Sequence, residues 1–206
     1  MSKKLGSCFV VLGILCLLAS AGFVFYNRME AQSGAEFSRT LLQAVQENVV
    51  ETAKMEPEQP ENPTEEVILE SEPREMVTVP AGDYESIGIL SIPALELELP
   101  VLADWSYEKL KKAPCHYHGS CYESDFVIAA HNYPSHFGRL SQLQPGDLVL
   151  FTDGAGEVHS YEVVLLETLQ PTATEEMITS GFDLSLYTCT PGGSNRVTAR
   201  CSRVNG

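Results

Sequence analysis

Three residues in the C-terminal half of the chain have the side chains that acyl transfer by a thiol requires. His131 ends the run "DFVIAAH", Cys189 ends the run "LSLYTC", and Arg196 follows the turn "TPGGSN". A cysteine that attacks an acyl carbon needs thiolate character, a proton donor for the departing amine, and a donor where the oxyanion develops. Cysteine, histidine and arginine supply these in turn, because a guanidinium stays protonated and offers several fixed donors.

Each of these residues also has an ordinary structural interpretation. A cysteine after an apolar run is commonly a buried small hydrophobe. A histidine before asparagine is commonly a turn residue, and an arginine that opens a strand is commonly an edge charge. On the residues alone, a non-catalytic anchored β-domain with an inert Cys189, such as an adhesin or a sensor, therefore stays open beside the catalytic interpretation.

The elements that must position these residues are short strands. From about Tyr84 onward, β-prone runs alternate with turn signals, which predicts a mostly-β domain with one core. The segment "IGILSIPALELELPV" predicts two strands broken at Pro93, and the apolar run before His131 is typical of a central strand buried on both faces. A short helix is expected from Trp105 to Lys112. Strand ends of a rigid sheet can fix reactive groups while loops shape a cleft.

The N-terminal segment has the character of a membrane anchor. Residues 5–26 carry no charge, and as a helix they are long enough to cross a hydrocarbon core of roughly 30 Å. Lys3 and Lys4 precede them, so we expect a single-pass protein of the cell membrane with a cytoplasmic N-terminus and an extracellular domain. The alternative is a cleaved signal peptide, since "ASA" at residues 19–21 resembles a processing site.

A connecting region separates the predicted anchor from the domain. Residues 36–55 predict an amphipathic helix that is a stalk or packs on the domain; its apolar positions are Phe37, Leu41, Val45 and Val49. Residues 56–75 are rich in glutamate and proline, which predicts a solvated spacer. The expected division is residues 1–28 as cytoplasmic tip and anchor, 29–80 as acidic, partly helical stalk, and 81–206 as the catalytic domain.

Charge and cysteine content narrow the function classes. The chain has 13 basic and 28 acidic residues, a net charge of −15, and no basic stripe, so nucleic acid is excluded as an expected partner. An exported location permits disulfides among four cysteines, whose three full pairings the sequence does not rank. These are Cys115, Cys121, Cys189 and Cys201.

Several spaced segments resemble the signatures of one enzyme family. "LYTCTPGGSNRVTARCSRV" closely resembles the C-terminal signature of sortases, the membrane-anchored cysteine transpeptidases of Gram-positive bacteria, in which a Leu-x-Thr-Cys strand and a short loop precede an arginine. "VIAAHNYPSHFGRLSQLQPGD" resembles their histidine signature, and "IGILSIPALELELPV" and "APCHYHGS" resemble further family segments. The resemblance covers about residues 84–204, in the family's order.

The resemblance implies a fold and a mechanism. The implied fold is a sortase-type eight-stranded β-barrel with short helices, preceded by a transmembrane helix and a linker. By analogy, Cys189 attacks the carbonyl after threonine in a sorting signal like Leu-Pro-x-Thr-Gly, His131 protonates the departing amine, and Arg196 steadies the substrate and the oxyanion. The thioester is then opened by an amine of a peptidoglycan precursor or of a pilin lysine, and no cofactor or metal is needed.

Two further residues are candidates for substrate binding. Thr188 precedes the nucleophile and either adds a donor near the oxyanion or is a plain β-branched strand residue. His116 matches the family's His-Tyr pair, so a role near the cleft and a structural role both stay open.

Two segments could bind a metal, and the first of them could instead form a disulfide. "CHYHGSC" offers four possible ligands, but the spacing matches no common zinc pattern and would make a cramped tetrahedron. A disulfide between Cys115 and Cys121 is a further alternative for this segment. Acidic loops bind calcium in some sortases, and Glu175 and Glu176 could do so here, but a solvated turn is the favoured interpretation. Cys201, Arg200 and Arg203 are expected to be structural.

Departures from the family's pattern leave the subclass unresolved. Ala130 stands where the family more often has glycine, and the loop between Cys189 and Arg196 is short. The segment before the domain lacks the Asp-Pro-aromatic lid of pilin-building members, which predicts an open site whose turnover does not rise when residues 27–80 are deleted. The connection from Leu169 to Asp183 leaves no room for the long helix of class B members.

A peptidase that hydrolyses cell-wall peptides is the remaining enzymatic alternative. Papain-like peptidases place cysteine before histidine, usually at the start of a helix. Here His131 precedes Cys189, and both follow strand-like runs. The order along the chain therefore favours the transpeptidase.

Overall fold

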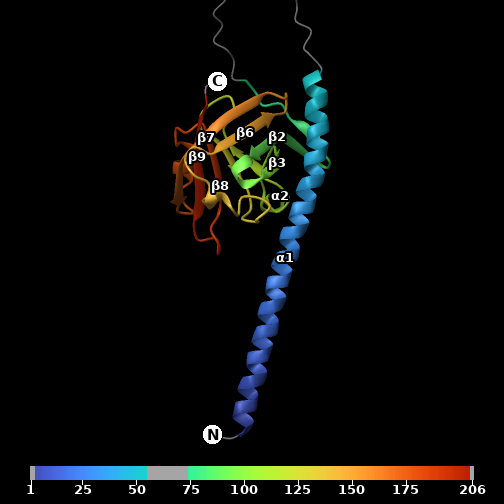
Figure 1. Ribbon diagram of the computed structural model, residues 1–206, viewed down its shortest axis with the longest axis vertical. Coiled ribbons are helices and arrows are strands. Elements are labelled where there is room, and N and C mark those ends of the chain that lie inside the picture. Colours follow the sequence, from blue (N-terminus) through green and yellow to red (C-terminus); the bar gives the residue numbers. More distant parts are fainter. Residues whose placement is uncertain (1–2, 55–73, 205–206) are drawn as a thin grey trace, which may run out of the picture.

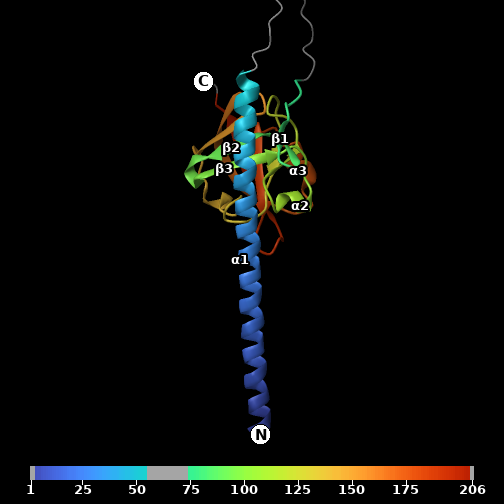
Figure 2. The same ribbon diagram turned by 90° about the vertical axis from the view of Figure 1, so that its right-hand side faces the viewer.

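The computed structural model of the chain describes residues 3–54 and 74–204. Figures 1 and 2 show a long helix and a β-domain that lies along the C-terminal half of that helix. The spacer expected at residues 56–75 lies outside the described residues, except for its last two positions.

One continuous helix, α1 (Lys3–Lys54), contains both segments that the sequence predicts as separate helices. Residues 9–26 are exposed, and the helix is long and apolar enough to cross a membrane. Farther along, Leu41, Val45 and Val49 are buried against the β-domain. The apolar stripe therefore packs on the domain and does not form a free stalk.

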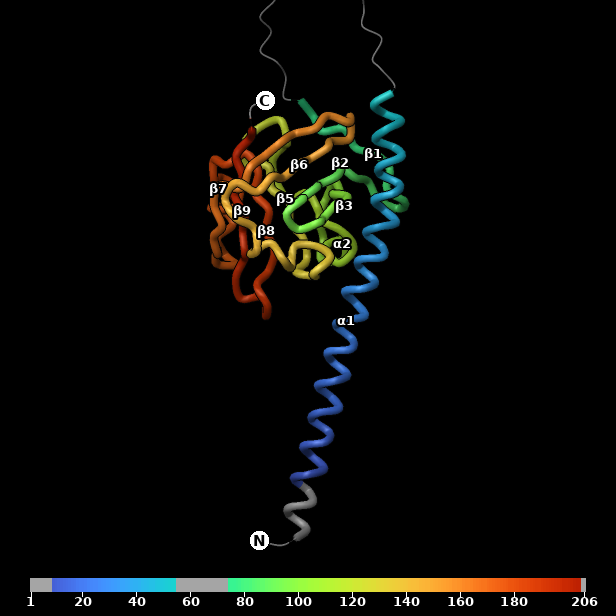
Figure 3. Tube along the Cα trace, in the orientation of Figure 1, coloured from blue at the N-terminus to red at the C-terminus, as the bar shows by residue number. Residues whose placement is uncertain are grey.

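The strands form one mixed sheet that closes on itself, as Figure 3 shows. In the described residues they are β1 (Val79–Ala81), β2 (Tyr84–Ile92), β3 (Leu97–Leu102), β4 (Cys115–His118), β5 (Phe126–Ala129), β6 (Leu148–Asp153), β7 (Val158–Leu169), β8 (Leu184–Cys189) and β9 (Arg196–Arg203). Their order is β1-β2-β3-β4-β5-β8-β9-β7-β6, and a further pairing of β6 with β2 closes β2 to β9 into a barrel. The expected eight-stranded barrel is confirmed.

The pairing of β5 with β8 matters most for the site. These two strands are parallel and adjacent, and β9 pairs antiparallel with β8 on the other side. All four residues of β5 are buried, as expected for a central strand. Because parallel strands end at the same edge of a sheet, the residues that follow β5 and those that end β8 come together.

The barrel interior supplies the main core. Its largest side chains include Phe126, Phe151 and Tyr161, all fully buried. Burying one such side chain contributes roughly 1.5–3 kcal/mol to folding. The short helices of the β-domain are η1 (Pro93–Leu95), α2 (Tyr107–Leu110), η2 (Leu140–Gln142) and α3 (Thr174–Ile178).

The helix expected from Trp105 to Lys112 forms only a single turn, α2. Its N-terminus is capped by Ser106, whose hydroxyl accepts a hydrogen bond from the backbone N–H of Lys109 at 3.2 Å. Capping of this kind satisfies one of the N–H groups that a helix start leaves unpaired.

Candidate active site

Cys189 and Arg196 are brought together by the hairpin of β8 and β9. Cys189 is the last residue of β8, Arg196 is the first of β9, and the two are direct partners in the antiparallel register. Side chains of such partners lie on one face of the sheet, with Cβ atoms about 4.5–5.5 Å apart. The sequence predicted that both residues serve one site, and the register places them side by side.

The loop between these partners is closed by its own hydrogen bonds. The Thr190 N–H donates to the Asn195 carbonyl at 2.9 Å, and the Asn195 N–H donates to the Thr190 hydroxyl at 3.0 Å. Gly192 and Gly193 have φ of 84° and 76°, in the left-handed region that glycine adopts without a steric penalty. The turn therefore holds the ends of β8 and β9 in register.

The guanidinium of Arg196 is fixed along one edge. Its Nη1 donates to the Gly193 carbonyl at 3.1 Å and to the Asn195 carbonyl at 3.2 Å. Within the described residues its other nitrogens have no hydrogen-bond partner, so they are free to donate to a bound group.

His131 reaches the same edge of the sheet from β5. Ala129 is the register partner of Tyr187, and the Ala130 N–H donates to the Tyr187 carbonyl at 3.1 Å. Continuing this parallel register by two residues puts His131 level with Cys189. The three residues that the sequence singles out therefore lie at the ends of three adjacent strands.

The imidazole of His131 is half-buried and stacked on Tyr133. The ring centroids are 4.1 Å apart, and the ring planes differ by 17°. Burial lowers the pKa of His131 below its usual value, and this outweighs the opposite effect of Asn132 and of the Glu30 carboxylate. A lowered pKa makes the imidazolium a stronger acid, which suits donation of a proton to a departing amine.

A cleft opens beside Cys189 and Arg196. Aromatic side chains form one side of it: Trp105, Tyr107, Tyr117 and Tyr187. The Tyr117 and Tyr187 rings meet edge to face with centroids 5.3 Å apart. An apolar aromatic wall next to a few polar groups is typical of a site that binds an extended ligand.

The segment around α3 also lines the cleft, and a buried arginine holds this wall. Arg200 is only 2% exposed; its Nε donates to Glu167 at 2.7 Å and its Nη1 to the Ser185 hydroxyl at 2.8 Å. Its Nη2 donates to the Glu176 carbonyl, in α3, at 2.7 Å. Met177 of α3 lines the cleft. The structural role expected of Arg200 is thus to fix this wall.

The remaining predicted site residues are engaged with the backbone. Thr188 is buried, and its hydroxyl donates to the Ala130 carbonyl at 2.8 Å, so it ties β8 to the residue before His131. His116 lies with Nε2 2.8 Å from the Gly119 carbonyl and Nδ1 3.2 Å from the Ala103 carbonyl, and it is not one of the residues that line the cleft.

Cys115 and Cys121 are both free thiols in the described structure. Cys115 packs under α1, whereas Cys121 belongs to the barrel core. The Cys115–Cys121 disulfide is therefore not formed, because the two thiols point into separate cores.

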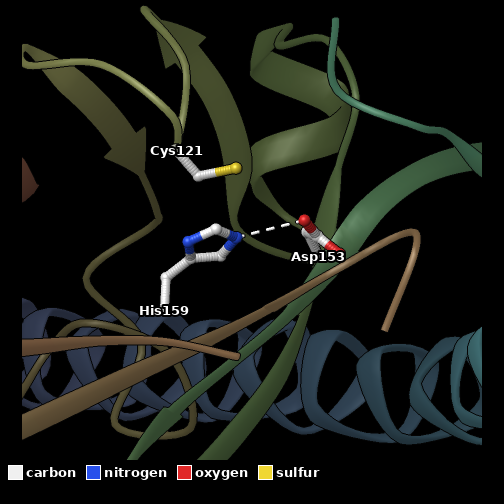
Figure 4. A group of neighbouring side chains, drawn as sticks. All are labelled: Cys121, Asp153 and His159. Atoms are coloured by element: carbon white, nitrogen blue, oxygen red, sulfur yellow. Dashed lines mark hydrogen bonds and ion pairs between the residues drawn. The ribbon is translucent and has the colours of Figure 1, made fainter. Parts of the chain in front are cut away.

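A second cluster of polar side chains lies inside the barrel and was not anticipated from the sequence. Cys121, Asp153 and His159 are buried and point toward one another (Figure 4), with their potential ligand atoms within 4.8 Å. They come from the loop before β5 and from both strands of the β6–β7 hairpin. The β6–β7 hairpin joins Asp153 and His159, but no local pattern could have revealed that Cys121 lies beside them.

The Cys121–Asp153–His159 cluster is organised as a hydrogen-bonded group. One Asp153 oxygen accepts from the N–H groups of Ala155 and Glu157, and the other accepts from the Tyr122 hydroxyl at 2.8 Å and lies 3.1 Å from His159 Nε2. Burial raises the pKa of Cys121 to about 12, so its thiol keeps its proton. These bonds occupy the carboxylate and favour a structural role over a metal site.

Comparison with known proteins places the chain in one protein family. The model of the sortase domain matches residues 90–204. Sortase A from Corynebacterium diphtheriae is 23% identical with a TM-score of 0.54, and the match covers 60% of this chain and 62% of that one, less than two thirds of its length. Sortase C1 from Streptococcus suis is 32% identical with a TM-score of 0.52, covering 59% of this chain and 74% of that one.

A third similar structure is a sortase D5 transpeptidase from Clostridium perfringens. It is 19% identical with a TM-score of 0.52, and the match covers 58% of this chain and 79% of that one. At such identities, this structure and the diphtheria enzyme show the fold alone. No curated protein matches the chain.

Proposed function

The chain belongs to the sortase family, and from that premise we propose that it is a cysteine transpeptidase with Cys189 as nucleophile. The observation that carries the proposal is the direct cross-strand pairing of Cys189 with Arg196 beside an aromatic cleft. The β5–β8 register, continued by two residues, brings His131 level with Cys189 and supports a catalytic role for His131 as proton donor.

In the proposed first step, the Cys189 sulfur adds to the carbonyl carbon of the scissile bond. Arg196 donates hydrogen bonds to the oxygen as its negative charge develops. When the carbon–nitrogen bond breaks, the departing amine takes a proton from the His131 imidazolium. A thioester on Cys189 is left.

In the second step, an acceptor amine adds to the thioester carbonyl. The amine gives up its proton to His131, the carbon–sulfur bond breaks, and Cys189 leaves as the thiolate. The product is a new amide, and the enzyme returns to its starting protonation state. Each atom and proton is accounted for without a cofactor.

The proposed substrates are proteins with a sorting signal like Leu-Pro-x-Thr-Gly, cleaved after threonine. The acceptor is an amine of the cell envelope, from a peptidoglycan precursor or a pilin lysine. The aromatic wall of the cleft supports an extended peptide as ligand. Thr188 and His116 are proposed to contribute indirectly, through the backbone carbonyls that they contact.

The proposed location is the cell membrane, with residues 1–28 as cytoplasmic tip and anchor and residues 81–206 as the extracellular catalytic domain. The exposed apolar side chains of residues 9–26 support this arrangement, because they cover no part of the β-domain. Residues 29–80 connect the two.

The test uses the full chain in detergent micelles, as wild type, Cys189→Ala and Cys16→Ser. Quenched peptides with Leu-Pro-x-Thr-Gly-like sequences are added with and without amines, and mass spectrometry reads products and protein adducts. We expect cleavage after threonine, a thioester on Cys189, and ligation to one class of amine. Cys16→Ser is the matched control, because Cys16 is an exposed thiol on α1, away from the cleft.

Two results would contradict the proposal. Cleavage that yields only the hydrolysed peptide with every amine would identify a peptidase. Folded protein that forms no adduct with any peptide, and whose Cys189 reacts with iodoacetamide no faster than an ordinary thiol, would favour a non-catalytic domain.

A further inference from the structure

The helix α1 touches the loop that carries His131. At Gly34 the helix backbone comes so close to the domain that an added Cβ would stand 2.6 Å from the Lys111 carbonyl oxygen and 3.2 Å from Cε2 of Tyr133. Glycine is among the poorest residues for a helix interior, so its presence there has a local structural reason. It allows α1 to meet the edge of the Tyr133 ring.

The face of the same ring supports His131. Tyr133 is 7% exposed, and its face stacks on the imidazole with the centroids 4.1 Å apart. The Tyr133 ring is thus in contact with α1 at its edge and with His131 at its face.

The backbone around Tyr133 is tightly wound. The N–H groups of His136 and Gly138 both donate to the Tyr133 carbonyl at 2.9 Å, and the Phe137 N–H donates to the His131 carbonyl at 3.2 Å. These bonds close the loop on itself and fix where the Tyr133 ring can lie.

The side chain of His131 lacks the partner that orients many catalytic histidines. Its Nδ1 is buried and has no hydrogen-bond partner among the described residues. In catalytic triads a carboxylate on this nitrogen sets the tautomer and the ring orientation. Here the stacked tyrosine is the contact that fixes the plane of the ring.

We propose that Tyr133 is a positioning residue for His131 and that α1, through Gly34, holds Tyr133 in place. The inference rests on the proposed role of His131 in proton transfer. It makes α1 a structural part of the active site as well as an anchor. Loss of the contact between Gly34 and Tyr133 therefore lowers turnover more than it lowers substrate binding.

The charges around His131 do not account for its lowered pKa. Glu30 of α1 and Lys111 after α2 act on it with opposite sign, and they form an ion pair of 3.3 Å. His136 is fully buried; burial and the neighbouring His131 lower its pKa to about 4, so it is neutral near pH 7. The environment of His131 is therefore dominated by burial, to which the Tyr133 ring contributes directly.

The first experiment compares Tyr133→Leu, Tyr133→Phe and Gly34→Ala in the full chain in micelles. Tyr133→Leu is expected to lower kcat roughly tenfold with KM within about twofold, because a misplaced proton donor slows chemistry and not binding. Tyr133→Phe keeps the stacked ring and is expected to rescue kcat. Gly34→Ala is expected to lower kcat although alanine favours the helix itself.

Val49→Ala is the matched control. Val49 is a buried residue of α1 that packs on β-domain residues away from His131. It is expected to lower stability but to leave kcat unchanged. Wild-type kcat in Tyr133→Leu, or an equal loss of kcat in Val49→Ala and Gly34→Ala, would overturn the inference.

A second readout does not depend on turnover. The pKa of His131, followed by NMR of its ring, is expected to rise toward the usual value near 6.5 in Tyr133→Leu and Gly34→Ala, because water reaches the ring. Tyr133→Phe is expected to leave it low. An unchanged His131 pKa in all variants would contradict the inference, whereas the absence of cleavage by wild type would count against the proposed function alone.

Discussion

Cys189 and Arg196 face each other across the first pair of the β8–β9 hairpin, so backbone hydrogen bonding sets the distance between the thiol and the guanidinium. The Arg196 Nη1 is already bonded to two carbonyls of the hairpin loop. One edge of the guanidinium therefore anchors it, and another edge is available for catalysis.

Replacement of Arg196 by lysine is predicted to be nearly as harmful as replacement by alanine. A single ammonium cannot hold the loop carbonyls and also present fixed donors to an oxyanion. We expect kcat to fall about 100-fold or more, as for loss of an oxyanion donor, with unfolding unchanged. Peptide cleavage and thermal unfolding of both variants test this, and wild-type kcat in Arg196→Lys would contradict it.

Substitution of Gly193 by alanine is predicted to weaken the hairpin turn. Its φ of 76° costs an L-residue about 1–2 kcal/mol, although no atom would clash with the added Cβ. We expect a lower free energy of unfolding and a reduced kcat/KM. Gly181→Ala, at a similar φ but outside the hairpin, should show the loss of stability with less loss of activity.

Removal of Arg200 is predicted to release the α3 wall. Arg200→Met leaves the buried Ser185 hydroxyl and the Glu176 carbonyl without their donor, which we expect to cost about 2–3 kcal/mol of stability and to raise KM. Arg74→Met, which breaks the exposed Arg74–Glu157 pair, should cost about 1 kcal/mol or less. Urea unfolding and peptide KM measure both, and equal effects would show that α3 is held by other contacts.

The Asp153 carboxylate is predicted to make the barrel sensitive to acid. Burial raises its pKa, but the hydrogen bonds from His159 and Tyr122 outweigh this, so the net pKa is lowered. A carboxyl whose folded pKa is depressed contributes stability that is present above its unfolded pKa near 3.9 and is lost as the pH falls through the folded value. The difference in unfolding free energy between wild type and Asp153→Asn should therefore be largest near neutral pH and shrink below about pH 4. A constant difference from pH 7 to pH 3 would argue against an ionised Asp153.

Much of the barrel, the pairing of Cys189 with Arg196 and the place of His131 after the neighbouring strand could be predicted from the sequence. Apolar runs of strand length mark the core, and the reactive residues stand where those runs end, which is a local signal. The family resemblance supplied the eight-stranded barrel, whereas the order in which the strands pair comes from the structure. The expected open site, tested by deleting residues 27–80, stays a prediction; in the described part α1 packs on β1, β2 and β3, and the cleft is lined by other residues.

The continuity of α1 and the role of Gly34 could not be predicted. The anchor and the amphipathic stripe differ in composition, so the sequence predicts two separate helices. No proline lies before Pro57, however, so nothing of that kind ends the helix between them. The contact of Gly34 with Tyr133 joins residues about a hundred positions apart. The docking of α1 on the β-domain brings Gly34 and Tyr133 together, and the tertiary fold likewise brings Cys121 to His159.

The unbroken helix α1 fixes the distance between its apolar stretch and the β-domain. The apolar stretch of α1 ends at Tyr26, and Gly34 meets the loop of His131 eight residues later, which at 1.5 Å per residue is about 12 Å along the axis. The turn between β8 and β9, red in Figure 3, projects from the end of the barrel that faces the N-terminal half of α1. With α1 as the proposed anchor, the loop of His131 lies about 12 Å beyond the apolar stretch, a distance that about four extended residues of a membrane-tethered substrate would span.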